Sequence, residues 1–293
     1  MQIRVGFEMD YDCPQPTPMV VTLNVHFTRV SDLVGHDNLK VEPPVPMSAY
    51  RDSFGNWCTR LVAPKGRTRI SADAMVKDSG LPDAFVPEAQ QVRVQDLPEE
   101  TLLFLLGSRY CETDRLSETA WNLFGNGPTG WGRVQAICDW VHNNIEYRYM
   151  SGRADLSASE VIERRYGVCR DFAHAAIALC RAFNLPARYV TGHLPDIGFI
   201  DPGTPMDFHA YCEVYLGQEW LTFDPRFNVP RIGRVKVAHG ADAVDGAFAT
   251  IYGEANLTHF QVWAYQVNPQ QVSVGDPIDL SRRLDGNQTV RLN

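Results

Sequence analysis

The chain has 293 residues, of which 44% are hydrophobic, so it can bury a sizeable core and, at this length, favours two domains. Its formal charge of -8, with no run of lysines or arginines, argues against nucleic acid and anionic membranes as partners, because both need a concentrated positive charge to bind. No apolar run approaches the roughly 18 residues that a membrane helix needs, and residues 1–21 lack the pattern of a secretory signal, so we expect a cytoplasmic protein.

Residues 1–98 predict an N-terminal antiparallel β-sandwich. Short β-rich runs such as MVVTLNVHF and WCTRLVA alternate there with clusters of Pro, Gly and Asp. Gly55 and Asn56 separate two such runs and predict a hairpin turn, because these turns need positive φ angles. Titratable residues do not cluster in this part of the chain. We therefore place a domain boundary at residue 98 and expect the chemistry in residues 99–293.

After residue 98 the pattern changes to helices followed by strands. Residues 131–145 carry an apolar stripe at helical spacing, made of Val134, Ile137, Cys138, Val141 and Ile145. A short helix follows, with Ser157 and Glu160 spaced as a capping box. The next helix, residues 169–183, is apolar on nearly every side and ends before Pro186. Three strands then follow at residues 187–194, 209–216 and 219–225, so the second domain is predicted to be α+β.

Cys169 lies where a buried helix normally carries a capping hydroxyl or carboxylate. The free N–H groups of the first turn and the helix dipole favour a thiolate, and they lower the pKa of such cysteines from about 8.5 into roughly the 3.5–7.5 range. Arg165 and Arg170 add positive charge nearby. The chain has seven cysteines, and their odd number and wide spacing fit reduced thiols better than disulfides. We therefore interpret Cys169 as a candidate nucleophile and the other cysteines as small core residues.

A thiolate that performs acyl transfer needs a partner that carries the proton, and His209 is the best candidate. Residues 209–216 and 219–225 form a predicted hairpin. If its loop is Leu216-Gly217, His209 lies opposite Asp224, and if the loop is Gly217-Gln218, Asp224 becomes a diagonal neighbour on the same face. In both registers the carboxylate can accept the proton of His209 Nδ1 and stabilise the imidazolium. His174 points away from Cys169 on the same helix, so we interpret it as a core histidine.

These segments resemble a known family. The stretches GVCRDFAHAAIALCRAFNLPARYVTGHL, HAYCEVYL and WLTFDP are similar to the transglutaminase-like superfamily, in particular to its bacterial two-domain enzymes and cysteine proteases. The similarity extends upstream to YRDSFGNW and SRYCETDRL, so it covers nearly the whole chain. It implies a papain-like core in which the nucleophile helix packs on an antiparallel sheet. It also implies that Cys169 is the nucleophile, His209 the general acid/base and Asp224 the orienting carboxylate.

The resulting hypothesis is an enzyme that cleaves peptide or carboxamide bonds through a thioester, with a peptide or protein as its substrate. Hydrolysis is favoured over transamidation by the resemblance alone, and the transglutaminase reaction stays open as the alternative. A non-catalytic peptide-binding scaffold is a second alternative. No cofactor is expected, because Cys138 and His142 lack further zinc ligands at the right spacing and no calcium loop is present. The second donor of an oxyanion hole and the oligomeric state are not predicted.

Overall fold

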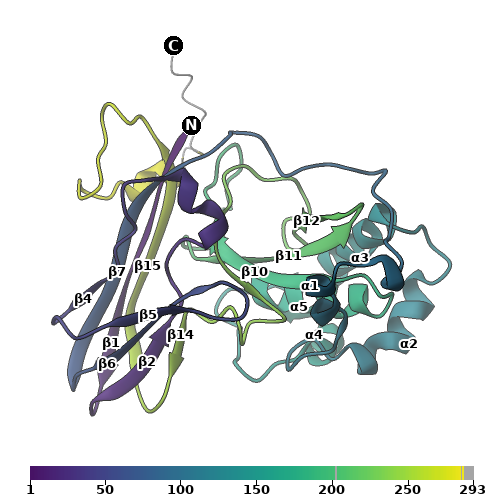
Figure 1. The fold of residues 1–293 in the computed structure, drawn as a ribbon, viewed down its shortest axis with the longest axis horizontal. Coiled ribbons are helices and arrows are strands. Elements are labelled where there is room, and N and C mark those ends of the chain that lie inside the picture. Colours follow the sequence, from purple (N-terminus) through teal and green to yellow (C-terminus); the bar gives the residue numbers. More distant parts are fainter. Residues whose placement is uncertain (202, 285, 287–293) are drawn as a thin grey trace.

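The computed structural model describes residues 1–201, 203–284 and 286, and it places a β-sandwich beside a body of helices and a third main sheet (Figure 1). One sheet of the sandwich has the order β15-β1-β7-β3, with β4 also paired to β7, and the other has the order β14-β2-β6-β5. The strands of the sandwich are β1 (Gln2–Cys13), β2 (Thr17–Val21), β3 (Leu33–Val34), β4 (Lys40–Glu42), β5 (Ser48–Arg51), β6 (Trp57–Ala63), β7 (Gly66–Lys77), β14 (Ala249–Ile251) and β15 (Asn256–Val267).

The sandwich core lies between the two sheets, as the alternating pattern predicts. Phe7 and Met9 of β1 pack with Met19 of β2, Leu61 of β6 and Ile70 of β7, and all five are buried. Alternate residues of a strand point to opposite faces, so each strand contributes its apolar face to this layer. The predicted hairpin is present, since β5 and β6 pair antiparallel on either side of residues 52–56.

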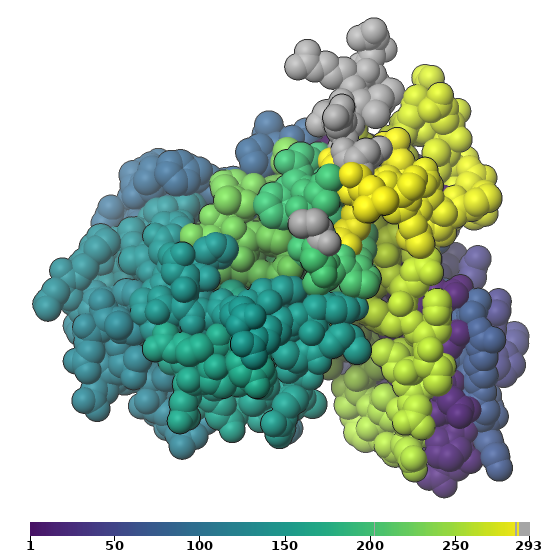
Figure 2. Space-filling view, turned by 180° about the vertical axis from the view of Figure 1, so that it is seen from behind, coloured from purple at the N-terminus to yellow at the C-terminus, as the bar shows by residue number. Residues whose placement is uncertain are grey.

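The last two strands of the sandwich come from the far end of the sequence, and this corrects the predicted division into residues 1–98 and 99–293. β15 pairs with β1 from Gln2↔Val267 to Asp12↔Asn256, and β14 pairs with β2. Figure 2 shows the yellow-green C-terminal strand lying beside the purple N-terminal one. Without β15, the long strand β1 would present an edge of unpaired N–H and C=O groups, and a distant segment satisfies them. A local pattern carries no information about that partner.

The second body, which we call the helical body, consists of residues 99–240 and has the predicted α+β order. Its four-stranded antiparallel sheet has the order β12-β11-β10-β13, and helices cover one face (Figure 1). Its elements are α1 (Glu99–Leu102), α2 (Thr113–Phe124), α3 (Trp131–Asn144), β8 (Glu146–Tyr147), α4 (Ala158–Arg164), β9 (Tyr166–Gly167), α5 (Cys169–Arg181), β10 (Ala187–His193), β11 (His209–Leu216), β12 (Glu219–Phe223) and β13 (Val235–Gly240).

Helix α5 is the centre of this body. Residues 171–181 of α5 are buried, and they pack against α2, α3 and α4 on one side and against β10 and β11 on the other. The helix starts abruptly because Asp171, in its first turn, accepts a hydrogen bond from the Val168 N–H at 2.9 Å. The buried residues of α3 include the whole predicted stripe from Val134 to Val141, and the Ser157–Glu160 capping box is present at α4. A buried helix on an antiparallel sheet is the arrangement that the family resemblance implies, and it is confirmed here.

Two connections join the bodies. Residues 78–98 run from β7 towards α1, and residues 241–248 return from β13 to β14. Phe208, which comes just before β11, inserts into the sandwich core, where its ring lies 5.8 Å from that of Phe7 and 4.2 Å from that of Phe248. This contact anchors the start of β11 against the sandwich. None of the helices in the described ranges is both long and apolar enough to cross a membrane.

Candidate active site

Cys169 is the first residue of α5, and it is the one cysteine of the seven that is only partly buried, whereas the other six are fully buried. Its own backbone N–H lies in the first turn of the helix, where N–H groups have no helical acceptor. Cys169 and His209 both line a cleft of about 940 Å³. The start of α5 and the start of β11 contribute to this cleft, and Leu257–Phe260 of β15 contribute from the sandwich. The cleft therefore lies where the two bodies meet.

The surroundings of the Cys169 thiol correct the expectation of a low pKa. Burial and the nearby Asp207 carboxylate raise the pKa of Cys169 to about 11, although the Ala210 N–H and Arg226 favour the thiolate. The helix start supplies only partial charges, whereas removal of water from around the sulfur penalises the whole charge of a thiolate. In this structure Cys169 is therefore a thiol at neutral pH, and it needs a base to become a nucleophile.

The hairpin from β11 to β12 has the second of the two predicted registers. Cys212 pairs with Phe223 and Leu216 with Glu219, which leaves Gly217 and Gln218 as the loop. Both loop residues have positive φ angles, 56° and 75°, as a tight two-residue hairpin requires. His209 opens β11, and Asp224 follows directly after β12, so the two side chains lie diagonally on the same face.

His209 and Asp224 are in direct contact, through a different ring nitrogen than predicted. His209 Nε2 lies 2.7 Å from Asp224 Oδ2, and both side chains are buried. The prediction assigned this bond to Nδ1, but the diagonal register places the carboxylate at the far end of the ring, where Nε2 reaches it. Nδ1 is therefore the nitrogen left to exchange a proton with Cys169 or a substrate. Among the described contacts there is no hydrogen bond between Cys169 and His209, although both line the cleft.

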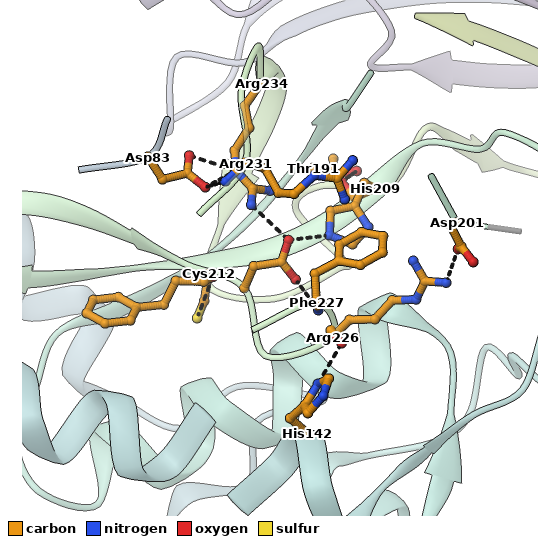
Figure 3. Close-up of polar contacts among 12 residues, drawn as sticks. Asp83, His142, Thr191, Asp201, His209, Cys212, Arg226, Phe227, Arg231 and Arg234 are labelled. Carbon is orange, nitrogen blue, oxygen red and sulfur yellow. Dashed lines mark hydrogen bonds and ion pairs between the residues drawn. The ribbon is translucent and has the colours of Figure 1, made fainter. Parts of the chain in front are cut away.

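Two charged residues that the sequence did not single out support Asp224. Arg234 Nη2 donates to Asp224 Oδ2 at 2.9 Å, and Arg234 Nε donates to both oxygens of Asp83 at 2.9 Å (Figure 3). The Phe227 N–H donates to Asp224 Oδ1 at 3.2 Å. Asp83 belongs to the connection between the bodies, and Arg234 comes just before β13. No local pattern marks either residue, because their contacts span 151 and 10 positions of the chain.

Burial and these charges together hold His209 neutral, and the charges hold Asp224 ionised. Burial opposes ionisation of Asp224, but His209 and Arg234 together outweigh it and hold the pKa of Asp224 well below its usual range. Burial lowers the pKa of His209, and Asp224 offsets only part of that effect, while Arg234 adds to it. At neutral pH His209 is therefore a free base beside a charged carboxylate, which is the state in which it can accept a proton.

The other residues considered from the sequence have structural surroundings. His174 is fully buried, its Nε2 accepts the Ala243 N–H at 3.1 Å, and its ring stacks on Tyr110 at 5.1 Å, so it is a core histidine as predicted. Cys138 lies in the core, whereas His142 bonds the Arg226 carbonyl oxygen at 2.8 Å. Within the described ranges no group of three or more metal-binding side chains was found.

The comparisons with known proteins concern the family and the fold. The family model described as "Transglutaminase-like superfamily" matches residues 118–225, which contain Cys169, His209 and Asp224. The crystal structure of a protein from Cytophaga hutchinsonii, described as a "putative cysteine protease", is 32% identical, and the similarity covers 95% of this chain and 92% of that one with a TM-score of 0.78. An uncharacterized protein of Mycobacterium tuberculosis is 29% identical over 210 residues, which are 64% of this chain and 66% of that protein.

Proposed function

This chain belongs to the transglutaminase-like superfamily, and from that premise we propose that it is a cysteine-dependent acyl-transfer enzyme that acts on peptide or carboxamide bonds. The observation that carries the proposal is the placement of Cys169 at the start of a buried helix, in the same cleft as His209, which is paired with Asp224. A nucleophile, a base and a carboxylate that orients the base are the three groups that acyl transfer through a thioester requires.

In the proposed reaction, His209 Nδ1 takes the proton of Cys169 as the sulfur attacks the substrate carbonyl carbon. The N–H of Cys169 donates a hydrogen bond to the oxyanion, aided by the positive end of the α5 dipole. The imidazolium then gives its proton to the departing amine, the C–N bond breaks and a thioester remains. Water, deprotonated by His209, attacks the thioester and releases a carboxylic acid and the free thiol. Asp224 stabilises the imidazolium in both halves of this cycle.

The pKa directions favour proton transfer during the attack over a preformed ion pair. Burial raises the pKa of Cys169 to about 11 and lowers that of His209. A neutral thiol beside a neutral imidazole therefore forms the resting state, and charge develops only once a substrate fills the cleft. We expect the rate to fall in acid as His209 becomes protonated, with an apparent pKa below about 6.5.

Hydrolysis is the proposed outcome for the thioester, and the description of the Cytophaga hutchinsonii protein as a "putative cysteine protease" supports it. Transfer to a primary amine is the alternative, since both reactions share every step up to the thioester. A cytoplasmic setting is part of the proposal, because all seven cysteines, which lie within the described residues, are free thiols. The proposed partner is a peptide or protein substrate.

A peptide-library experiment tests this function. The protein is incubated with a mixed library of N-acetylated peptide amides, quenched in acid and searched by mass spectrometry for an acyl adduct on Cys169. Released carboxylate or, with added n-butylamine, the alkylamide product separates hydrolysis from transamidation. Cys169→Ala should abolish adduct and product, whereas Cys58→Ala, at a buried cysteine of the sandwich, should leave both. Turnover by Cys169→Ala equal to that of the unaltered protein would refute the proposal.

A further inference from the structure

We propose that Asp207 forms a subsite for a primary ammonium group of the substrate, beside Cys169 in the same cleft, an inference that rests on the acyl-transfer function proposed above. Asp207 lies two positions before His209, on the segment that leads into β11, and it lines the cleft. The aromatic contacts of Phe208 hold this segment against the sandwich. The carboxylate is therefore presented by an anchored stretch of backbone.

Asp207 is the only charged residue of the cleft lining without an ion-pair partner among the described residues. The pairs formed by the other lining residues are Arg170–Asp171, Arg226–Asp201, Arg283–Asp196, His209–Asp224 and His259–Glu8. The positive charge of Arg226 favours the ionised form of Asp207, but Arg226 forms its ion pair with Asp201. The Arg226 guanidinium also stacks on the Tyr147 ring, 3.6 Å from the ring centre. Within the described residues, the cleft thus has one carboxylate that forms no ion pair.

The unpaired carboxylate of Asp207 lies near the proposed nucleophile, Cys169. Asp207 lines the cleft together with Cys169, Tyr147 and Tyr149. Burial is the larger cause of the raised pKa of these three groups, and the charge of Asp207 adds to it. An ammonium group bound by this carboxylate would gain an ion pair, and the two tyrosine rings of the same cleft offer faces for cation–π contacts. The same ammonium would cancel the charge that opposes thiolate formation. A cationic substrate would therefore bind and make Cys169 easier to deprotonate.

Binding can be measured without turnover. In the Cys169→Ala protein, n-butylammonium chloride is titrated and followed by NMR chemical-shift changes, with n-butanol as the neutral probe of the same length. Asp207→Asn in that background should weaken n-butylammonium binding at least tenfold. Glu219→Gln, which removes one exposed carboxylate outside the cleft, should leave it unchanged. Because burial raises the pKa of Asp207 to about 6, binding should strengthen as the pH rises from 5 to 7.

Kinetics identify which substrate carries the ammonium. Matched library peptides with Lys or norleucine at each position beside the scissile carbonyl are compared, and n-butylamine is added separately as an acceptor. A Lys preference of tenfold or more in kcat/KM places the ammonium on the acyl donor, and faster thioester release by n-butylamine places it on the acceptor. In Asp207→Asn either ratio should fall to about one. If the thioester forms but neither n-butylammonium binding nor the substrate preference depends on Asp207, the subsite is refuted. Binding through Asp207 without any thioester supports the subsite and refutes the enzyme.

Discussion

Replacing Asp224 with Asn separates the charge of this residue from its hydrogen-bond geometry. Asp224 Oδ2 accepts from His209 Nε2 at 2.7 Å and from Arg234 Nη2 at 2.9 Å, whereas Oδ1 accepts the Phe227 N–H at 3.2 Å. The single carbonyl oxygen of Asn would occupy the Oδ2 position, because that choice keeps the two short bonds. Its amide group would then face the Phe227 N–H and lose the longest bond. His209 should therefore keep its orientation in this variant.

The variant lacks the negative charge that stabilises the imidazolium. Two unit charges about 4 Å apart attract by about 4 kcal/mol at an effective dielectric constant of 20. Arg234 already offsets part of that attraction in the unaltered protein. We expect a loss of about 2–3 kcal/mol in the transition state, or roughly 30- to 150-fold in kcat/KM. Asp224→Ala also removes the orienting bond, and should cost roughly 1,000-fold or more.

The assay compares the two variants on a fluorogenic amide identified from the library and on p-nitrophenyl acetate. The nitrophenolate leaving group needs no proton, so both variants should lose less activity on the ester than on the amide. Asp12→Asn, at an exposed residue of β1, is the matched control and should match the unaltered protein. Equal rates for Asp224→Asn and the unaltered protein would show that the charge is not used. Equal losses in the Asn and Ala variants would refute the hydrogen-bond geometry.

Three further predictions use other contacts. Iodoacetamide should label only Cys169 in the native protein. The labelling rate should still increase above pH 9, because burial raises the pKa of Cys169 to about 11. A rate that is already constant at neutral pH would instead show a preformed thiolate. Arg234→Met leaves two carboxylates partly unpaired and should lower the free energy of unfolding by about 3–5 kcal/mol in urea titrations, against less than about 1 kcal/mol for the exposed control Arg93→Met. Burial lowers the pKa of His193 to about 3, so below pH 6.5 the imidazole of His193 is protonated in the unfolded chain and stays neutral in the folded one. Protonation therefore favours the unfolded chain, and between pH 7 and pH 5 His193 should lower the free energy of unfolding by about 2 kcal/mol. His193→Gln should remove that part of the pH dependence, and an unchanged pH profile would contradict the assignment.

Features that depend on neighbours along the chain could be predicted from the sequence. The start of α5 at Cys169 follows from the segment before it and the apolar residues after it, and the stripe of α3 follows from helical periodicity. The period of two along a strand placed His209 and Asp224 on one face for either hairpin loop. These patterns were sufficient to bring His209 and Asp224 together, because both lie on one hairpin.

The tertiary structure decided what depends on contacts between distant segments. β15 pairs with β1, and Arg234 and Asp83 support Asp224. Each of these contacts joins residues whose local sequences carry no sign of one another. The lack of an ion-pair partner for Asp207 in the cleft likewise depends on where distant charged residues lie. The pKa of Cys169 belongs to the same class, since it balances a local helix start against the loss of water imposed by the whole cleft. Backbone periodicity is a property of neighbouring residues, whereas desolvation and charge pairing are properties of the packed molecule. Desolvation and charge pairing set the pKa values of Cys169, His209 and Asp224, so the tertiary structure decides their protonation states.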